Sequence, residues 1–401
     1  MLKKPSLDAL LIEENQYGAH HYEPLPVVLT HGKGVYVWDI AGKRYLDMMS
    51  AYSAVSHGHC HPKLVKALCE QAQLLTIVSR AFYTDKLSPF LKELCELTGF
   101  EKALPMNTGA EAVETAIKAA RKWAYTVKGV AADQAEIIAC AGNFHGRTTT
   151  IVGLSTEPQY REGFGPFSAG LKTIPYGDVH ALKQAITPNT AAFLVEPIQG
   201  EGGIIVPPVG YLRAVLEVCR ANRVLMICDE VQTGLGRTGA LLACQHEHIQ
   251  PDAIILGKAL GGGMLPVSAF LASREVMDVF TPGDHGSTFG GNPLAAAVAR
   301  CALKVLIEEK LIERAQTLGE YFQEQLRMLQ SPLIRAVRGK GLLIGIEIDK
   351  RCTAREICLR LLKHGVLSKE THQTVVRLAP PLVITKEQID EGIAALREAL
   401  Q

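Results

Sequence analysis

The sequence predicts an α/β fold, with a mainly parallel β-sheet covered by helices and a smaller α+β domain beside it. Short apolar segments rich in branched residues alternate with longer helical segments through the middle of the chain. Both ends of the chain lack this alternation. The length of 401 residues and the 47% content of hydrophobic residues allow one large domain and a smaller one.

The central strands are predicted where short apolar runs are bounded by turn-forming residues, at residues 136–140, 191–196, 224–229, 253–257 and 267–272. A helical pattern from Tyr211 to Asn222 separates two of them. Strands alternating with helices in this way are typical of a parallel sheet.

The two ends predict different structure. Residues 34–47 alternate apolar and polar side chains around the turn at 39–42, which predicts a hairpin. After about Asn292 come a long helical stretch, the strand-like "GKGLLIGIEI", a helix ending near His364, "VVRLAPP" and a last amphipathic helix. We therefore expect three parts, namely an N-terminal segment (1–60) packed near the small domain, a large cofactor-binding domain (61–292), and a linking helix with the C-terminal small domain (293–401).

Composition excludes several classes of protein. The formal net charge is +1 and no segment is rich in Lys and Arg, so a nucleic-acid partner has no electrostatic support. No run of eighteen apolar residues occurs, and acidic residues interrupt the apolar stretch near the N-terminus, which argues against a membrane span or signal peptide. The ten cysteines form no Cys-x-x-Cys pair, so we expect buried thiols in a reducing, cytoplasmic compartment.

Lys258 follows the apolar run 253–256 and precedes a glycine cluster. Most lysines are solvated surface residues. Strands buried on both faces, however, end where parallel sheets build their sites, and a partly desolvated lysine there is a nucleophile for carbonyl carbon. A Schiff-base lysine would need a phosphate-binding element, an acidic partner for a ring nitrogen and a group on the ring face.

Candidates exist for the first two of these parts. In "NTGAEAVETAIKAARKW" (107–123), Thr108, Gly109 and Ala110 stand where a helix begins, so their backbone N–H groups could bind a phosphate, although a simple N-cap by Asn107 or Thr108 explains the stretch equally well. Asp229 ends the strand at 224–229 and could hold a pyridine nitrogen protonated, or could serve as a helix cap or ion-pair partner.

Candidates for the ring face lie in "AGNFHGRTTT" (141–150). Phe144 could stack on the ring, or belong to the core. Arg147 could bind a substrate carboxylate, or be an ordinary surface residue.

Two further motifs are weaker. "GLGRTG" (234–239) matches the glycine pattern of dinucleotide-binding turns and Asp252 lies where a ribose-binding acid would, but residues 229–233 separate the motif from its strand and no clear helix follows. "HGHCHP" (57–62) gathers histidines and a cysteine without a second ligand cluster. We interpret the first as a loop, and we predict no metal site.

The chain is identified as a member of the class III aminotransferases of pyridoxal-phosphate fold type I by motifs that run in order along nearly its whole length. These are "GKGVYVWDIAGKRYLD", "GHCHPKLVKAL", "NTGAEAVETAIKAAR", "NFHGRT", "EPIQGEGG", "CDEVQTGLGRTG", "LGKALGGG" and "HGSTFGGNPLA". The resemblance implies a seven-stranded, mainly parallel sheet and the cofactor pyridoxal 5'-phosphate.

The resemblance also implies roles for the cofactor-binding residues. Lys258 would form the Schiff base and move the proton during transfer, Asp229 would pair with the pyridine nitrogen and Gln232 with the ring hydroxyl, and Phe144 would stack on the ring. Backbone groups of Thr108, Gly109 and Ala110 would bind the phosphate from one subunit, and Ser287 and Thr288 from the other. A homodimer with its active sites at the interface follows from this arrangement.

Within the family, "HHYEPLPVVL" (20–29), "MMSAYSAVSHGHCHP" (48–62) and "VVRLAPPLVIT" (375–385) are similar to the members that transaminate ornithine. That similarity implies transfer of the terminal amino group of L-ornithine to 2-oxoglutarate by a ping-pong mechanism, giving glutamate and glutamate 5-semialdehyde. The semialdehyde cyclises to pyrroline-5-carboxylate, a compound of arginine metabolism and proline biosynthesis.

The implied substrate residues divide between the two half-reactions. Tyr22 and Tyr52 would orient ornithine, Arg147 would bind the distal carboxylate of oxoglutarate, and Arg377 its α-carboxylate, masked by Glu201 while ornithine reacts. His145 stands where some members have tryptophan, so the cleft near Arg147 could differ.

Rival functions stay open at this point. The nearest is another ω-aminotransferase of the family acting on acetylornithine, 4-aminobutyrate or a diamine. A nicotinamide dehydrogenase would depend on "GLGRTG", and a catalytically silent protein on the same fold would have no need of Lys258, Asp229 and both arginines.

Overall fold

The computed structural model describes residues 6–401, so residues 1–5 of the predicted N-terminal segment lie outside the described range. Its centre is a seven-stranded sheet in the order β4-β10-β9-β8-β7-β5-β6. The strands are β4 (Lys102–Met106), β5 (Glu136–Cys140), β6 (Leu171–Ile174), β7 (Thr190–Val195), β8 (Leu225–Asp229), β9 (Ala253–Leu256) and β10 (Ser268–Ala272).

Most neighbouring strands of this sheet are parallel. The ladder from β6 through β5, β7 and β8 to β9 is parallel throughout, and β10 runs antiparallel to both β9 and β4. The predicted fold class and all five predicted central strands are confirmed. Strands β4 and β6 were missed, because "KALPM" contains a proline and "LKTI" is interrupted by a lysine and a threonine.

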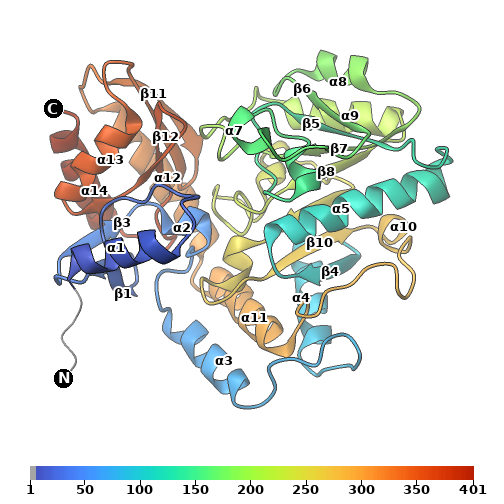
Figure 1. Cartoon of the computed structure of the whole chain (residues 1–401), viewed down its shortest axis with the longest axis horizontal. Helices are drawn as coiled ribbons and strands as arrows, with labels where there is room; N and C mark the ends of the chain where they lie inside the picture. The colour runs from blue at the N-terminus through green and yellow to red at the C-terminus, as the bar shows by residue number, and fades with distance from the viewer. Residues whose placement is uncertain (1–5) are drawn as a thin grey trace.

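Helices cover the large sheet, as the right-hand part of Figure 1 shows. The helix α5 (Gly109–Trp123) packs against β7, β9 and β10, and α9 (Tyr211–Ala221) packs against β8. The other helices of this part are α3 (Pro62–Ala72), α4 (Leu87–Thr98), α6 (Thr149–Val152), α7 (Pro158–Arg161), α8 (Val179–Ala185), α10 (Arg274–Met277) and α11 (Pro293–Glu308), with shorter turns η1 (Ala124–Lys128), η2 (Ala243–Glu247) and η3 (Lys258–Gly261).

Two smaller sheets are built from the ends of the chain, and the first of them combines strands of both ends. One has the order β1-β2-β3-β13, and the predicted hairpin supplies β2 and β3 while β13 pairs in parallel with β3. The other, β11-β12-β15-β14, is antiparallel. Their strands are β1 (Leu29–Lys33), β2 (Tyr36–Asp39), β3 (Arg44–Asp47), β11 (Ile334–Lys340), β12 (Leu343–Ile348), β13 (Val366–Leu367), β14 (Lys369–Thr371) and β15 (Val375–Leu378).

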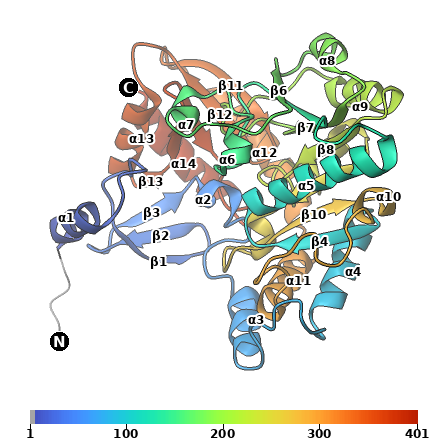
Figure 2. The same cartoon turned by 45° about the vertical axis from the view of Figure 1, so that its right-hand side comes forward.

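The N-terminal elements lie beside the C-terminal elements in both views (Figures 1 and 2). The parallel pairing of Leu46 with Val366 joins the two ends of the chain directly. The helices of this part are α1 (Leu7–Tyr17), α2 (Ser50–Ser53), α12 (Leu311–Arg327), α13 (Ala354–Lys363) and α14 (Lys386–Ala399).

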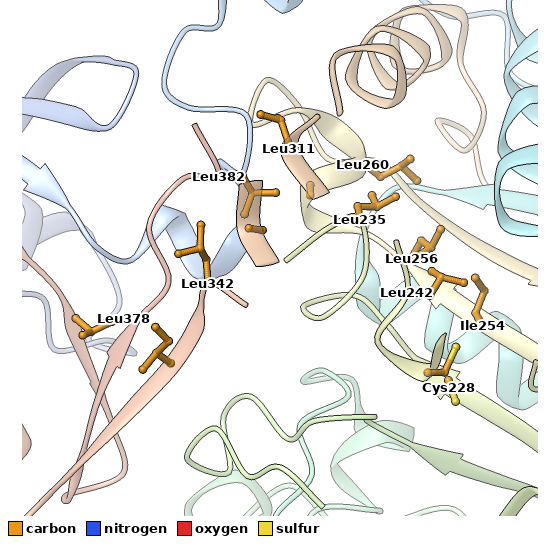
Figure 3. Packing of buried hydrophobic residues seen from close by; sticks show 14 of the residues in the cluster. Cys228, Leu235, Leu242, Ile254, Leu256, Leu260, Leu311, Leu342, Leu378 and Leu382 are labelled. Carbon is orange, nitrogen blue, oxygen red and sulfur yellow. The ribbon is translucent and has the colours of Figure 1, made fainter. Parts of the chain in front are cut away.

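One apolar core runs from the large sheet into the C-terminal part. Figure 3 shows Ile254 and Leu256 of β9 on one side and Leu342, Leu378 and Leu382 on the other. All of them belong to the same buried cluster. Burial of this kind stabilises a fold by about 25 cal/mol per Å² of apolar surface removed from water, so the core resists independent movement of the two parts.

The remaining predictions concern cysteines, metals and membranes. All ten cysteines are free, and Cys60 and Cys69 are exposed, so the expectation of buried thiols is wrong for these two. Among residues 6–401, no group of three or more His, Cys, Asp and Glu side chains could hold a metal ion. Within the same range, no helix is both long and apolar enough to cross a membrane.

Candidate active site

A cavity of about 230 Å³ opens at the carboxyl ends of β8 and β9. Parallel sheets build their sites at this edge, because the strand ends and the following loops converge there. The cavity gathers side chains from separate parts of the chain, and its lining consists of Gly109, Ala110, Phe144, His145, Gly146, Glu196, Glu201, Asp229, Val231, Gln232, Thr233 and Lys258.

Lys258 lines this cavity. Strand β9 is fully buried, and Gly257 links it to Lys258, whose φ of +45° turns the chain out of the sheet. Burial lowers the pKa of the Lys258 ammonium, although the carboxylates of Glu201 and Asp229 oppose that shift. A lysine whose neutral form is favoured in this way is a nucleophile.

Asp229 is the last residue of β8 and is 5% exposed. One carboxylate oxygen accepts a hydrogen bond from the Val231 backbone (3.1 Å), and the other is 2.7 Å from Nδ1 of buried His145. Burial alone would lower the pKa of His145, but the hydrogen bond and negative charge of Asp229 outweigh burial and raise it. The imidazole therefore orients the carboxylate beside the cavity.

Glu196 is a second buried carboxylate in the cavity. It accepts hydrogen bonds from the backbone N–H groups of Phe144 (3.0 Å) and Gly200 (3.1 Å). Burial raises the pKa of Glu196 to about 7, against the opposing charge of His145. Glu196 thus fixes the loop that carries Phe144 and His145.

The N-terminus of α5 points small residues at the cavity. The Thr108 side chain caps the helix by accepting from Glu111 N (3.2 Å), and the Glu111 carboxylate accepts from Thr108 N (2.8 Å). Gly109 and Ala110 line the cavity, whereas Thr108 is exposed. A Cβ added to Gly109 would lie 3.0 Å from Cγ1 of Val231, so a larger residue would crowd this end of the cavity.

This arrangement fits pyridoxal phosphate. Free N–H groups and the dipole at a helix N-terminus bind a phosphate. The carboxylate of Asp229 and the amine of Lys258 lie in the same cavity, as the pyridine nitrogen and the aldehyde carbon of that cofactor require. Thr108 is an ordinary N-cap and also neighbours this end of the cavity. The helix start at residues 107–110 can therefore be both a simple N-cap and a phosphate-binding element.

Gln232 reaches the cavity from the loop after β8. Its amide group is 3.5 Å from the Tyr52 carbonyl. A Cβ added to Gly200 would lie 1.6 Å from Gln232 Oε1. Gly200 is therefore required for the position of the Gln232 side chain.

Phe144 lies in the cavity wall, but Arg147 lies outside it. Arg147 is exposed, and its guanidinium stacks on Tyr160, 3.6 Å from the ring centroid. Phe144 meets the same tyrosine edge-on at 6.1 Å. The planar stack leaves the edge of the guanidinium free to bind a carboxylate.

Glu201 and Arg377 form a bidentate ion pair, with hydrogen bonds of 2.6 and 2.8 Å. Arg377, on β15, is fully buried and Glu201 lines the cavity. Burial alone would raise the pKa of Glu201, but the charge and hydrogen bonds of Arg377 lower it. Burial likewise opposes the charged form of Arg377, and Glu201 raises the pKa of that guanidinium.

Tyr52 lies against this ion pair, with the Arg377 guanidinium 4.8 Å from its ring centroid. Tyr52 belongs to α2, where four consecutive non-glycine residues have positive φ (44°, 47°, 58° and 75° for Ser50 to Ser53). This left-handed turn costs on the order of 1–2 kcal/mol per residue. Asp47 supports it by accepting hydrogen bonds from Met49 N and Ser50 N, both 2.8 Å.

Tyr22 lies farther from the cavity of Lys258. It is 70% exposed and shares a hollow of about 940 Å³ with Tyr52. Tyr22 and Tyr52 thus face one space.

Ser287 and Thr288 lie apart from Lys258 within this chain. They line a different hollow, with Ser79, Arg80 and His285. Ser287 Oγ accepts hydrogen bonds from Asn107 (2.9 Å) and Gly290 N (3.0 Å).

Sequence reasoning missed the supporting residues. Glu196, Asp47 and Arg237 are buried polar groups, and nothing in the local pattern distinguishes them from surface residues. We expected His145 to affect only the shape of the cleft. Its place two residues before Arg147, a predicted carboxylate-binding residue, was a signal that it also belongs to the site.

The histidines of "HGHCHP" have separate partners, namely Ala302 O for His57, Asp47 for His59 and Glu309 for His61.

Comparison with known proteins finds similar chains along nearly the whole sequence. The family model of class-III aminotransferases matches residues 17–400. An ornithine aminotransferase of Geobacillus sp. (strain WCH70) is 59% identical over 96% of each chain. A solved ornithine aminotransferase of Toxoplasma gondii, with partial occupancy of PLP at its active site, superposes with a TM-score of 0.98 at 46% identity, over 100% of this chain and 95% of that one. An acetylornithine aminotransferase of Elizabethkingia anophelis has a TM-score of 0.90 at 50% identity, over 99% of each chain.

Proposed function

The chain belongs to the class III aminotransferase family, and from that premise we propose that it is a transaminase that moves the terminal amino group of L-ornithine to 2-oxoglutarate. The observation that carries the proposal is the buried Glu201–Arg377 pair beside Tyr52. Curated relatives named ornithine aminotransferase, 55–59% identical over nearly the whole chain, support the same donor.

The cofactor of the family is pyridoxal 5'-phosphate, which supplies an aldehyde carbon for an amine and a ring that takes up electron density. Lys258 would hold the aldehyde carbon and, once released, carry the proton. Asp229, oriented by His145, would hold the ring nitrogen protonated. Phe144 would cover the ring face, Gln232 would bond the ring hydroxyl, and backbone groups of Thr108, Gly109 and Ala110 would bind the phosphate.

The ion pair explains how one site treats two different amino groups. While Glu201 accepts hydrogen bonds from Nη1 and Nη2 of Arg377, the guanidinium cannot bind the α-carboxylate of ornithine. The terminal amine, and not the α-amine, would then be presented to the aldehyde carbon that Lys258 holds. Tyr22 and Tyr52 would hold the α-amino and carboxylate end of ornithine. In the second half-reaction, Glu201 would move away, Arg377 would bind the α-carboxylate of oxoglutarate, and Arg147 would bind its distal carboxylate.

We extend the proposal to a homodimer whose two chains complete each other's site. Ser287 and Thr288 line a hollow that shares no residue with the cavity of Lys258, which supports a site where these two side chains reach the phosphate of the partner subunit. Large exposed apolar side chains occur within a few residues, along the chain, of those that line this hollow, namely Leu74, Phe82, Tyr83 and Phe289. A cytoplasmic location is supported by the free state of all ten cysteines.

The test compares amino donors under identical conditions. Steady-state rates are measured with L-ornithine, N-acetylornithine, 4-aminobutyrate and putrescine, each with 2-oxoglutarate, and pyrroline-5-carboxylate is trapped. The proposal predicts that ornithine has the highest kcat/KM and gives the trapped product. A higher kcat/KM for N-acetylornithine, 4-aminobutyrate or putrescine would contradict the choice of donor and leave the transaminase chemistry intact.

A further inference from the structure

The "GLGRTG" loop contains a fully buried arginine that the proposed chemistry does not use. The Arg237 side chain is 0% exposed and has no carboxylate partner among the ion pairs of residues 6–401. Burial lowers the pKa of its guanidinium to about 9, and Asp47 is the carboxylate whose charge opposes that shift. A buried charge held only by neutral oxygens is costly, so its retention needs an explanation.

One arm of the guanidinium holds both ends of the left-handed turn α2. Arg237 Nη2 donates to Ser50 Oγ (3.3 Å) at the start of the turn and to Ser56 Oγ (2.9 Å) just beyond it. Ser56 Oγ in turn donates to Ser53 O (2.9 Å), the last residue of the turn. The turn presents Tyr52 to the Glu201–Arg377 pair.

The other arm holds β15, which carries Arg377, and β12, the strand that pairs with it. Arg237 Nη1 donates to Leu342 O (3.1 Å), directly before β12, and to Pro380 O (2.5 Å), shortly after β15. Strands β12 and β15 pair, with Arg377 opposite Gly345. The Arg237 carbonyl also accepts from Leu342 N (3.0 Å).

The same loop is anchored to the cofactor end of the cavity. Arg237 follows Asp229 and Gln232 in one continuous segment from β8. The backbone crossing is tight, because a Cβ added to Gly341 would lie 2.4 Å from the Thr238 carbonyl carbon. The rigid fork of an arginine fits this set of oxygens, whereas a lysine has a single charged nitrogen on a flexible chain.

We propose that Arg237 is a positioning residue for substrate selection, which fixes Tyr52 through one arm and Arg377 through the other, relative to Asp229 and Gln232. This inference rests on the proposed function, because Tyr52 and Arg377 are its substrate-binding residues. It assigns a role to "GLGRTG" other than dinucleotide binding. The buried charge is retained because only a forked donor reaches both segments.

The first test replaces Arg237 by methionine and compares the variant with a matched control. Arg314→Met removes a similar arginine, whose Nη2 donates to Val383 O and Ile384 O without touching α2 or β15. Both variants should lower the melting temperature. Only Arg237→Met should weaken the binding of glutarate to the holoenzyme, measured by calorimetry, and raise KM for ornithine, each by about tenfold or more.

A milder variant separates the two arms and covers a failure of Arg237→Met to fold. Ser50→Ala with Ser56→Ala removes the Nη2 acceptors and keeps both Nη1 bonds. Hydrogen exchange of the amides in residues 50–57 should speed up, and KM for ornithine should rise several-fold, on the order of threefold. The double variant also removes the bond from Ser50 Oγ to Ala379 O (2.6 Å). Glutarate affinity should nevertheless stay near the wild-type value, because both Nη1 bonds of Arg237 and the pairing of β12 with β15 still hold Arg377.

Two results would overturn the inference. One is equal loss of stability in Arg237→Met and Arg314→Met with unchanged glutarate affinity and ornithine KM, which would make Arg237 a structural bond only. The other is a wild-type exchange rate at residues 50–57 in the double serine variant. Failure of the proposed function is distinguishable, because it would show as a wild-type enzyme inactive on ornithine, while glutarate affinity and hydrogen exchange would still separate the variants.

Discussion

At the scale of single residues, the site depends on charges whose state is set by a buried neighbour. Asp229 is held by His145, Arg377 by Glu201, and the loop of Phe144 by Glu196. Asp229 was predicted from its place at the end of a strand, and Arg377 together with its partner Glu201 was predicted from the resemblance to the family. The pairing of His145 with Asp229 was not predicted. The Asp229–His145 contact joins residues 84 positions apart, so local pattern could not predict it.

Glu201→Ala should change which amino group reacts. Without its partner, Arg377 is free to bind the α-carboxylate of an amino donor, and the ratio of kcat/KM for glutamate to that for ornithine should rise by about tenfold or more, equivalent to about 1.4 kcal/mol. Product analysis measures the ratio. Glu201→Gln is the matched control for size, and it should behave like the alanine variant because the charge does the masking. An unchanged ratio in both variants would disprove the masking role.

His57 should make the fold sensitive to acid. It is 2% exposed, and burial lowers its pKa from 6.5 to about 4. Between these two values the unfolded chain binds a proton at this histidine and the folded chain does not. The free energy of unfolding is therefore highest above pH 6.5 and falls by about 3 kcal/mol as the pH drops toward 4.

Urea unfolding between pH 4.5 and 7.5 measures that dependence. His57→Gln keeps an N–H for Ala302 O and should flatten the pH slope of the unfolding free energy. His180→Gln, at an exposed histidine, should leave the slope unchanged. Equal slopes in all three proteins would show that His57 does not set the acid limit.

At the scale of elements, the strands of the large sheet were predictable and the connections that shape the site were not. Strands such as β7 and β9 are continuous apolar runs, which a sheet buried on both faces requires. The turn α2 has no glycine in its left-handed stretch, Ser50 to Ser53. Its conformation depends on hydrogen bonds to Asp47, Arg237 and Ala379. Arg237 and Ala379 are distant in the sequence, and an aspartate three residues before Ser50 is not by itself a signal for such a turn.

The strain in α2 can be measured by glycine substitution. Ala51 is exposed and has a φ of +47°, so Ala51→Gly should raise the unfolding free energy by about 0.5–1 kcal/mol. Ala394 is exposed within the regular helix α14, and Ala394→Gly should lower it by about 1 kcal/mol. A loss of stability in both variants would show that α2 is not strained.

At the scale of the whole molecule, the order of the motifs along the chain predicted the family and the fold class. Both are confirmed, and the family model matches residues 17–400. The pairing of β3 with β13 was not predictable, because parallel partners 320 positions apart leave no local signal (Leu46 and Val366). The boundaries at residues 60 and 292 stay predictions, and so does the dimer.

Mixing two inactive variants tests the shared site. Lys258→Ala and the double variant Ser287→Ala with Thr288→Ala each impair every site of their own dimers. If the partner supplies Ser287 and Thr288, a mixed dimer contains one intact site, and random mixing should restore about a quarter of the wild-type sites. Lys258→Ala mixed with Asp229→Ala should restore none, because both residues line the same cavity. No restoration in the first mixture would contradict the shared site.

The most direct measurement is the visible absorbance of the purified protein before and after L-ornithine is added without an oxo acid, with Lys258→Ala beside the wild type. The account predicts that the wild type absorbs in the visible, loses that absorbance with ornithine and yields trapped pyrroline-5-carboxylate, while Lys258→Ala forms no product. A wild type that stays colourless after addition of pyridoxal phosphate, or that keeps its colour with ornithine, would contradict it.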